Sequence, residues 1–279
     1  LKFRAISAKP FAFSDSLVTN PQTTITIFQS NGIDSVFHPA VYLKYDAGKS
    51  RLAARKDKHA YKYAPFIDSY HKMEMQGEYL TWDLATDSVN LGIINAKNKV
   101  PLQISSMDYF QPEVFTRLKG LASFHPLQLA VGYRTIAKSN SFRVEDMANQ
   151  YKLNPNTVRG TMVGLEQKGF IEYNSKTDII TLTRKAVLYS YANMRRMDYD
   201  NINIYSLNPT GRNATFSLDS LDLTLTGIDG FLISDSLKVL VQPADYSIVV
   251  KKNRDFKFDG KMTAGKFVYK GENFQFGYD

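Results

Sequence analysis

Short runs in which apolar and polar residues alternate fill both ends of the chain. Such runs lie at residues 24–28, 41–45, 89–93, 221–225 and 266–269. Alternation with a period of two is typical of strands that bury one face. Turn-forming pairs such as Asn31-Gly32 and Ala47-Gly48 separate the runs. We therefore expect two β-rich regions, over residues 1–120 and 198–279.

Between these regions the apolar residues recur with the spacing of helices. Pro126 opens one amphipathic helix, because the missing N–H of proline does no harm in the first turn. Asn154 and Pro155 form the start of another, with Asn154 as the N-cap. This helix is expected to end at Gly169. A strand hairpin over 170–183 and a closing helix over 184–194 complete the segment.

This middle segment resembles a known family of bacterial regulators. The residues that carry the likeness are Thr157-Val158, Leu165-Glu166 and Gly169-Phe170-Ile171. They are similar to a pattern of winged helix-turn-helix proteins, in which a helix is followed by a hairpin called the wing. The resemblance implies a winged-helix domain over residues 121–197. The expected fold class is then α+β: a β-rich, solenoid-like scaffold with an inserted winged-helix domain, in which residues 198–279 continue the sheet of residues 1–120.

In DNA-binding members of that family the third helix enters the major groove. The candidate nucleic-acid or partner contacts are Asn156, Thr157, Arg159, Gly160 and Gly164 on this helix and Lys176 in the wing. Arg159 is the one charged residue among the helix positions. Small residues four apart let another backbone come close, which favours protein contact over DNA. DNA stays the alternative, because flanking cations such as Arg143 and Lys152 suit phosphate contacts.

The dipeptide Asp-Ser recurs in both β-rich regions. It begins at Asp15, Asp34, Asp68, Asp87, Asp219 and Asp235. One interpretation is a structural repeat of solenoid length. The simpler one, which we favour, is a hydrogen-bonding turn that starts a strand. Residues 260–274 are similar to coils of the lipopolysaccharide-transport jelly-roll family. Asp-Ser-aliphatic triplets are similar to glycosylation acceptors of bacterial envelope proteins, which favours a periplasmic or envelope location.

Composition limits the remaining chemistry. The chain has 279 residues, 43% of them hydrophobic, and a formal net charge of +8 concentrated in the middle segment. It has no cysteine, which excludes disulfides and thiol chemistry. No apolar run is long enough for a transmembrane helix. Because the chain lacks an initiator Met and ends within a strand-like alternation, we expect it to be part of a larger bacterial protein.

Candidate catalytic residues are few. His38 and His125 share the context Phe-His-Pro, which we interpret as a repeated aromatic turn rather than a pair of ligands. A basic run from Lys49 to Lys62 is typical of a solvated loop or a lysine-protected strand edge, with an anionic surface as the alternative. Paired carboxylates, nucleophile elbows and phosphate loops give no catalytic candidate. We therefore predict no catalytic residue, metal or cofactor.

These observations predict a non-enzymatic structural or interaction protein. Its partner is another protein or the rest of a longer chain, held through the winged helix. The alternative is a cytoplasmic DNA-binding regulator whose β-rich parts serve as sensor or oligomerisation domain. Binding to random duplex at low salt distinguishes the two.

Overall fold

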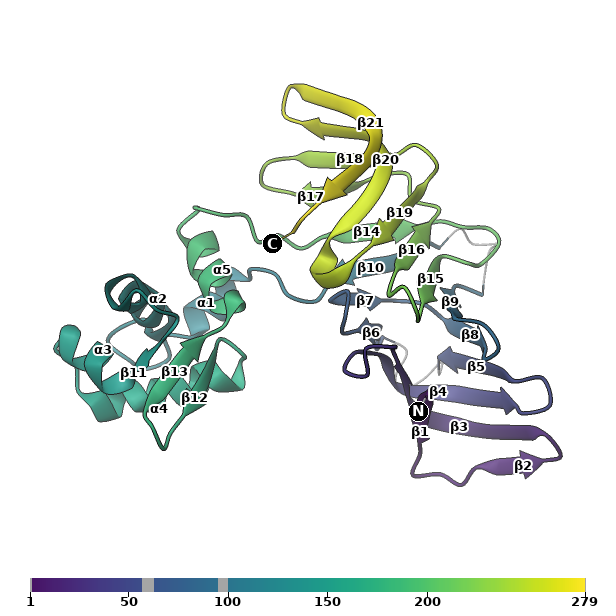
Figure 1. The fold of residues 1–279 in the computed structure, drawn as a ribbon, viewed down its shortest axis with the longest axis horizontal. Helices are drawn as coiled ribbons and strands as arrows, with labels where there is room; N and C mark the ends of the chain where they lie inside the picture. The colour runs from purple at the N-terminus through teal and green to yellow at the C-terminus, as the bar shows by residue number, and fades with distance from the viewer. Residues whose placement is uncertain (1, 57–62, 95–99, 279) are drawn as a thin grey trace. The chain divides into compact units, whose positions relative to one another are not determined.

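The computed structural model describes residues 2–56, 63–94 and 100–278, and Figure 1 shows the chain as a ribbon. It divides into two compact units. The first unit combines residues 1–107 with residues 201–279, and the second consists of residues 108–200. The second unit is thus an insertion in the first.

The strands of the first unit all belong to one 18-stranded sheet. They are β1 (Phe3–Ile6), β2 (Ala12–Ser14), β3 (Leu17–Phe28), β4 (Ser35–Asp46), β5 (Arg51–Lys56), β6 (Phe66–Asp68), β7 (Met73–Met75), β8 (Tyr79–Asp83), β9 (Ser88–Gly92), β10 (Leu102–Ser106), β14 (Asn203–Ser206), β15 (Ala214–Ser217), β16 (Leu223–Thr226), β17 (Phe231–Ser234), β18 (Val239–Pro243), β19 (Ser247–Val250), β20 (Phe256–Ala264) and β21 (Phe267–Phe276). A short 3-10 helix, Lys252–Arg254, links β19 to β20.

Two long strands bend the sheet back on itself. The start of β4 pairs with β6, whereas its end pairs with β5. Likewise β20 pairs first with β19 and then with β18. One path of paired strands runs from β4 through β5, β8, β9, β15, β16 and β19 to β20. The other runs through β6, β7, β10 and β14, and an isolated bridge between Ser206 and Ile228 continues it toward β17 and β18. The result is a nearly closed, barrel-like antiparallel sheet.

Strands from the two halves of the chain pair with one another in the wall of this barrel. Val89 of β9 pairs with Phe216 of β15, and Ile104 of β10 pairs with Ile204 of β14. Alternate residues point inward, so that the period-two pattern of the sequence becomes a single hydrophobic core. Phe66, Phe216 and Trp82 are among its largest buried side chains.

The solenoid-like scaffold expected from the sequence is wrong. Coils of a β-solenoid stack as parallel rungs, whereas every strand pair described here is antiparallel and the sheet closes on itself. The Asp-Ser spacing instead reflects turns. Ser35 begins β4 and Ser88 begins β9, directly after Asp34 and Asp87. The interpretation as strand-starting turns is therefore confirmed at these positions.

The lysine-protected strand edge expected for the basic run is not found in its described part, residues 49–56. Residues 51–56 form β5, which pairs with β4 on one side and β8 on the other. Arg51 and Arg55 are exposed on the outer face of this central strand. Residues 57–62 of the run lie outside the described residues.

The inserted unit is mainly helical. Its helices are α1 (Pro112–Arg117), α2 (Pro126–Ala137), α3 (Val144–Gln150), α4 (Pro155–Gln167) and α5 (Arg184–Asn193), and its strands β11 (Ser141–Arg143), β12 (Ile171–Asn174) and β13 (Ile179–Leu182) form a three-stranded sheet. The Asn154 side chain accepts hydrogen bonds from the backbone at the start of α4, as expected for an N-cap. Gly169, with φ of +72°, follows the end of α4.

The identification as a winged helix-turn-helix protein is nevertheless wrong. The chain is mostly antiparallel sheet, with 43% strand and 19% helix, and no winged helix-turn-helix module is apparent in the described residues. The residues behind the resemblance have ordinary packing roles: Val158, Leu165 and Phe170 fill the core, and the positive φ of Gly169 lets the backbone turn. Such packing and termination signals occur in many amphipathic helices, so they do not specify a family.

No helix of the described segments has the length and apolar character needed to cross a bilayer. This agrees with the expectation from the sequence.

Candidate interaction surface

Arg159, the charged residue among the predicted contacts on α4, already forms an ion pair within its own unit. The Arg159 guanidinium donates to both carboxylate oxygens of Asp178, at 2.9 and 2.8 Å, and to Asn156 at 2.9 Å. Tyr173 also donates its hydroxyl to Asp178. These contacts, chiefly the one from Arg159, hold the pKa of Asp178 below its usual value. Arg159 therefore links α4 to the β12–β13 turn.

The other predicted contacts are spread over two exposed places. Asn156 and Thr157 donate their backbone N–H groups to the Asn154 cap at the start of α4. Lys176 lies exposed in the β12–β13 turn. A Cβ added at Gly160 or Gly164 would meet no atom within 4 Å. The close backbone approach expected at these glycines is therefore not made by the described residues of this chain.

The repeated aromatic turn expected for the Phe-His-Pro pattern is wrong for His38, which lies within β4, whereas His125 is the N-cap of α2. His38 accepts a hydrogen bond from the Ala40 N–H and donates to the Ala64 carbonyl, each at 3.1 Å. Burial is the main reason that the pKa of His38 is lowered to about 4. His125 makes the same pair of contacts, from the Gln128 N–H and to the Phe115 carbonyl. Because backbone groups occupy both rings, neither imidazole presents a nitrogen for catalysis or a metal.

A third histidine forms a buried pair that the sequence did not reveal. His71 Nδ1 lies 2.5 Å from Asp68 Oδ2, and both side chains are at most 1% exposed. His71 Nε2 lies 3.0 Å from the Leu221 carbonyl. The pair ties the β6–β7 turn to the turn before β16, which are distant in sequence.

The surface best suited to binding is the hairpin formed by β20 and β21. A turn at Gly265, with φ of +58°, joins the two strands. The register pairs Met262 with Tyr269 and Ala264 with Phe267. Directly paired residues share a face of a sheet, so these four apolar side chains lie together.

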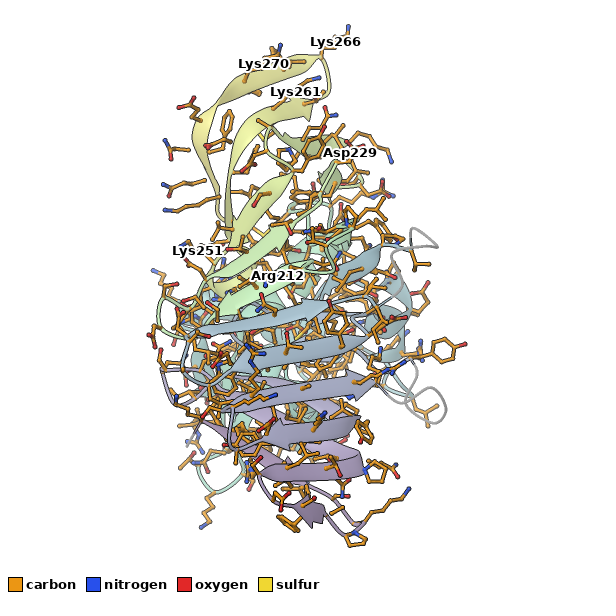
Figure 2. The ribbon with its side chains drawn as sticks, turned by 90° about the vertical axis from the view of Figure 1, so that its right-hand side faces the viewer. Arg212, Asp229, Lys251, Lys261, Lys266 and Lys270 are labelled. Atoms are coloured by element: carbon orange, nitrogen blue, oxygen red, sulfur yellow. The ribbon has the colours of Figure 1, made fainter. Side chains whose placement is uncertain are left out.

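The opposite face of the hairpin is basic. Here Lys261 pairs with Lys270, and Thr263 pairs with Val268. Figure 2 shows Lys261, Lys266 and Lys270 gathered at the free end of the hairpin. Like charges directly opposite one another repel, so the pair weakens the isolated hairpin. Carboxylates placed against these lysines would remove that repulsion.

The apolar face is a continuation of the barrel core that no described residue covers near the hairpin end. Phe256 and Phe258 lie on this face at the base of β20 and are 2% and 6% exposed. Further along, Phe267 is 68% exposed and Tyr269 is 48% exposed. The exposure thus rises from the barrel to the end of the hairpin, and the aromatic face is available to another molecule.

The hairpin also presents a free strand edge. Among the described residues β21 pairs only with β20, although it is 10 residues long. An edge of this length offers unpaired backbone groups to an incoming strand. The free edge, the aromatic face and the basic face therefore all belong to the β20–β21 hairpin.

The alternating pattern at residues 266–269 predicts a strand here but does not reveal the surface. The signal that could have found it is the turn at Gly265, because a hairpin centred there sets Lys261 opposite Lys270. Comparison of the chain with protein-family models, with curated proteins and with solved structures gave no match.

Proposed function

We propose that the protein is a non-enzymatic interaction protein that holds a protein partner through the β20–β21 hairpin. The observation that carries the proposal is that β21 combines a free edge with an aromatic face and a basic face. The partner adds a strand to β21, so that backbone hydrogen bonds supply affinity and side chains supply selectivity.

The two faces define the chemistry of that strand. Side chains of a strand alternate between faces, so its apolar residues cover Phe267 and Tyr269 while its acidic residues face Lys270 of β21, which is paired with Lys261 of β20. An extended segment of alternating acidic and apolar residues satisfies both faces at once. This surface holds lysines and aromatics rather than a nucleophile with a base, which supports binding instead of catalysis.

The test uses the 279-residue chain and a fluorescent peptide of alternating Glu and Val residues. We expect saturable binding by fluorescence polarisation. Replacing both Lys261→Gln and Lys270→Gln should weaken it about tenfold or more, equivalent to about 1.4 kcal/mol. The pair Phe267→Ser and Tyr269→Ser should weaken it similarly. Hydrogen exchange should show new protection in β21 and not elsewhere in the sheet.

A matched control is Lys44→Gln, which removes an exposed lysine from β4, a strand paired on both sides. It should leave the affinity unchanged. A peptide of alternating Lys and Val should not bind. Equal affinity of the hairpin variants and the unchanged chain would contradict the proposal, as would protection centred on another strand.

A further inference from the structure

The basic face of the β20–β21 hairpin changes the sign of its charge along β21. Near the hairpin turn, Lys270 pairs with Lys261. Two positions further along β21, toward the barrel, the same face carries Glu272, because alternate residues of a strand share a face. Lys270 and Glu272 are exposed, and neither side chain forms an ion pair or hydrogen bond within the described part of the chain. A strand that joins the free edge therefore meets first a cation and then an anion.

A β-bulge limits the length of edge that a partner strand can follow. The register of β21 with β20 shifts so that Glu272 and Asn273 together stand opposite Asp259. Asn273 has a φ of +55°, and its N–H donates to the Asp259 side chain. A bulge bends the strand and interrupts regular pairing. A regular partner strand therefore pairs with residues 267–272, from the hairpin turn to the bulge.

The apolar face determines which partner residues lie beside the charges. Phe267 and Tyr269 are exposed on this face and contact the apolar residues of the partner. Side chains alternate, so the residues between these apolar ones lie beside Val268, Lys270 and Glu272. A slip by one residue would turn the apolar side chains away from Phe267 and Tyr269. A slip by two residues toward the barrel would carry the partner into the bulge.

The surrounding sheet favours one direction for the added strand. Every strand pair described in this sheet is antiparallel, and antiparallel pairing is slightly more stable per residue than parallel pairing. A partner that runs antiparallel to β21 begins near the bulge and ends near the hairpin turn. It therefore passes Glu272 before Lys270.

We propose that Lys270 and Glu272 set the direction and register of the partner strand, which runs antiparallel to β21. The partner places a basic residue beside Glu272 and an acidic residue beside Lys270. Opposite charges on directly paired residues attract, whereas like charges repel. The partner sequence then reads basic, apolar, acidic and apolar toward the hairpin turn. This inference rests on the proposed function and adds the order of charges in the partner.

The experiment compares two fluorescent peptides that differ only in the order of their charges. Their cores read Lys-Val-Glu-Val-Thr-Val and Glu-Val-Lys-Val-Thr-Val, so composition and net charge are the same. Fluorescence polarisation with the 279-residue chain should show the first peptide bound about tenfold more tightly, because two attractive pairs replace two repulsive ones. Exchanging the protein charges, by Lys270→Glu together with Glu272→Lys, should reverse the preference.

The matched control exchanges the charges of an exposed ion pair elsewhere in the sheet, that of Arg51 in β5 with Asp83 in β8. Arg51→Asp together with Asp83→Arg should leave the preference for the first peptide unchanged. A nitroxide at the N-terminus of this peptide tests the direction. It should broaden the backbone NMR signals of Phe274 more than those of Gly265.

The outcomes separate the charge order from docking at the hairpin. Equal affinity of the two peptides, while the peptide of alternating Glu and Val residues still binds, would overturn the charge order alone. An unchanged preference in the variant with exchanged hairpin charges would overturn it as well, and stronger broadening at Gly265 would overturn the antiparallel direction. Binding of none of the three peptides would overturn the proposed function itself. Should the variant fail to fold, the two peptides on the unchanged chain still decide the charge order.

Discussion

At the scale of single residues, the open surface of α4 makes Gly160 and Gly164 a liability to stability. Neither has a neighbour within 4 Å of an added Cβ, and neither has a positive φ. Glycine costs a helix up to about 1 kcal/mol relative to alanine. We expect Gly160→Ala and Gly164→Ala each to raise the free energy of unfolding by several tenths to about 1 kcal/mol, measured by urea denaturation.

Gly169 is the matched control for that prediction. Its φ of +72° disfavours any side chain although the space around it is also open. Gly169→Ala should therefore destabilise the same unit. A loss of stability at Gly160 and Gly164 instead would mean that another surface packs on this helix face.

His38 gives the barrel a dependence on pH. Its ordinary pKa is 6.5, and burial lowers the pKa in the folded state to about 4. Between these values the unfolded chain binds more protons than the folded chain, so stability falls as the pH drops from 6.5 to 4. The loss is at most about 3 kcal/mol, because each pKa unit is worth about 1.4 kcal/mol. Urea denaturation across this pH window measures it.

The variant His38→Asn isolates this contribution. Asparagine does not titrate, and its side chain keeps a donor and an acceptor for the Ala64 carbonyl and the Ala40 N–H. The difference in unfolding free energy between the two proteins should shrink as the pH falls to 4. Parallel curves for the two proteins would show that other groups cause the acid sensitivity.

At the scale of elements, the β20–β21 hairpin contains a pair of like charges that lowers its stability and that we expect to serve binding. Lys261 and Lys270 repel one another as directly opposed like charges. Lys261→Glu should make this an attractive pair and raise the stability by about 0.2–1 kcal/mol. The same variant should weaken binding of the acidic peptide, because the new carboxylate pairs with Lys270 and offsets the positive charge that the peptide would otherwise face. Denaturation and fluorescence polarisation on one preparation measure the two effects.

The matched variant Lys44→Glu changes the same charge away from the hairpin. Lys44→Glu should leave peptide binding unchanged, whereas Lys261→Glu should weaken it. Loss of both stability and binding in Lys261→Glu would indicate misfolding rather than charge reversal.

The elements also show where prediction from sequence succeeds. Local patterns were sufficient for the strands at 24–28 and 41–45, which lie within β3 and β4, and for the helix that Asn154 caps. The faces of the hairpin were not predictable from alternation alone. A register shift between Phe258 and Gly260 decides which residues of β21 face the core, and it depends on the paired strand.

The closure of the barrel is set at the scale of the whole molecule. Ile104 pairs with Ile204 across the entire inserted unit, and Phe216 pairs with Val89. No local pattern encodes such partners, because strands with similar alternation could pair in many orders. The family resemblance of the middle segment failed for a related reason: helix capping and core spacing are local properties, whereas a family is defined by the assembled unit.

The same long-range pairing predicts that the barrel folds without its insertion. The two ends of the first unit are adjacent where the second unit leaves it: Ser106 donates its N–H to the Ile202 carbonyl at 3.0 Å and its hydroxyl to Asn201 at 2.9 Å. Replacing residues 108–200 by a short Gly-Ser linker thus closes a small loop at little entropic cost. We expect the shortened chain to unfold cooperatively and to keep peptide binding. Circular dichroism melting and the peptide-binding assay test it. The barrel would depend on the insertion if the shortened chain were unfolded while residues 108–200, made alone, still folded.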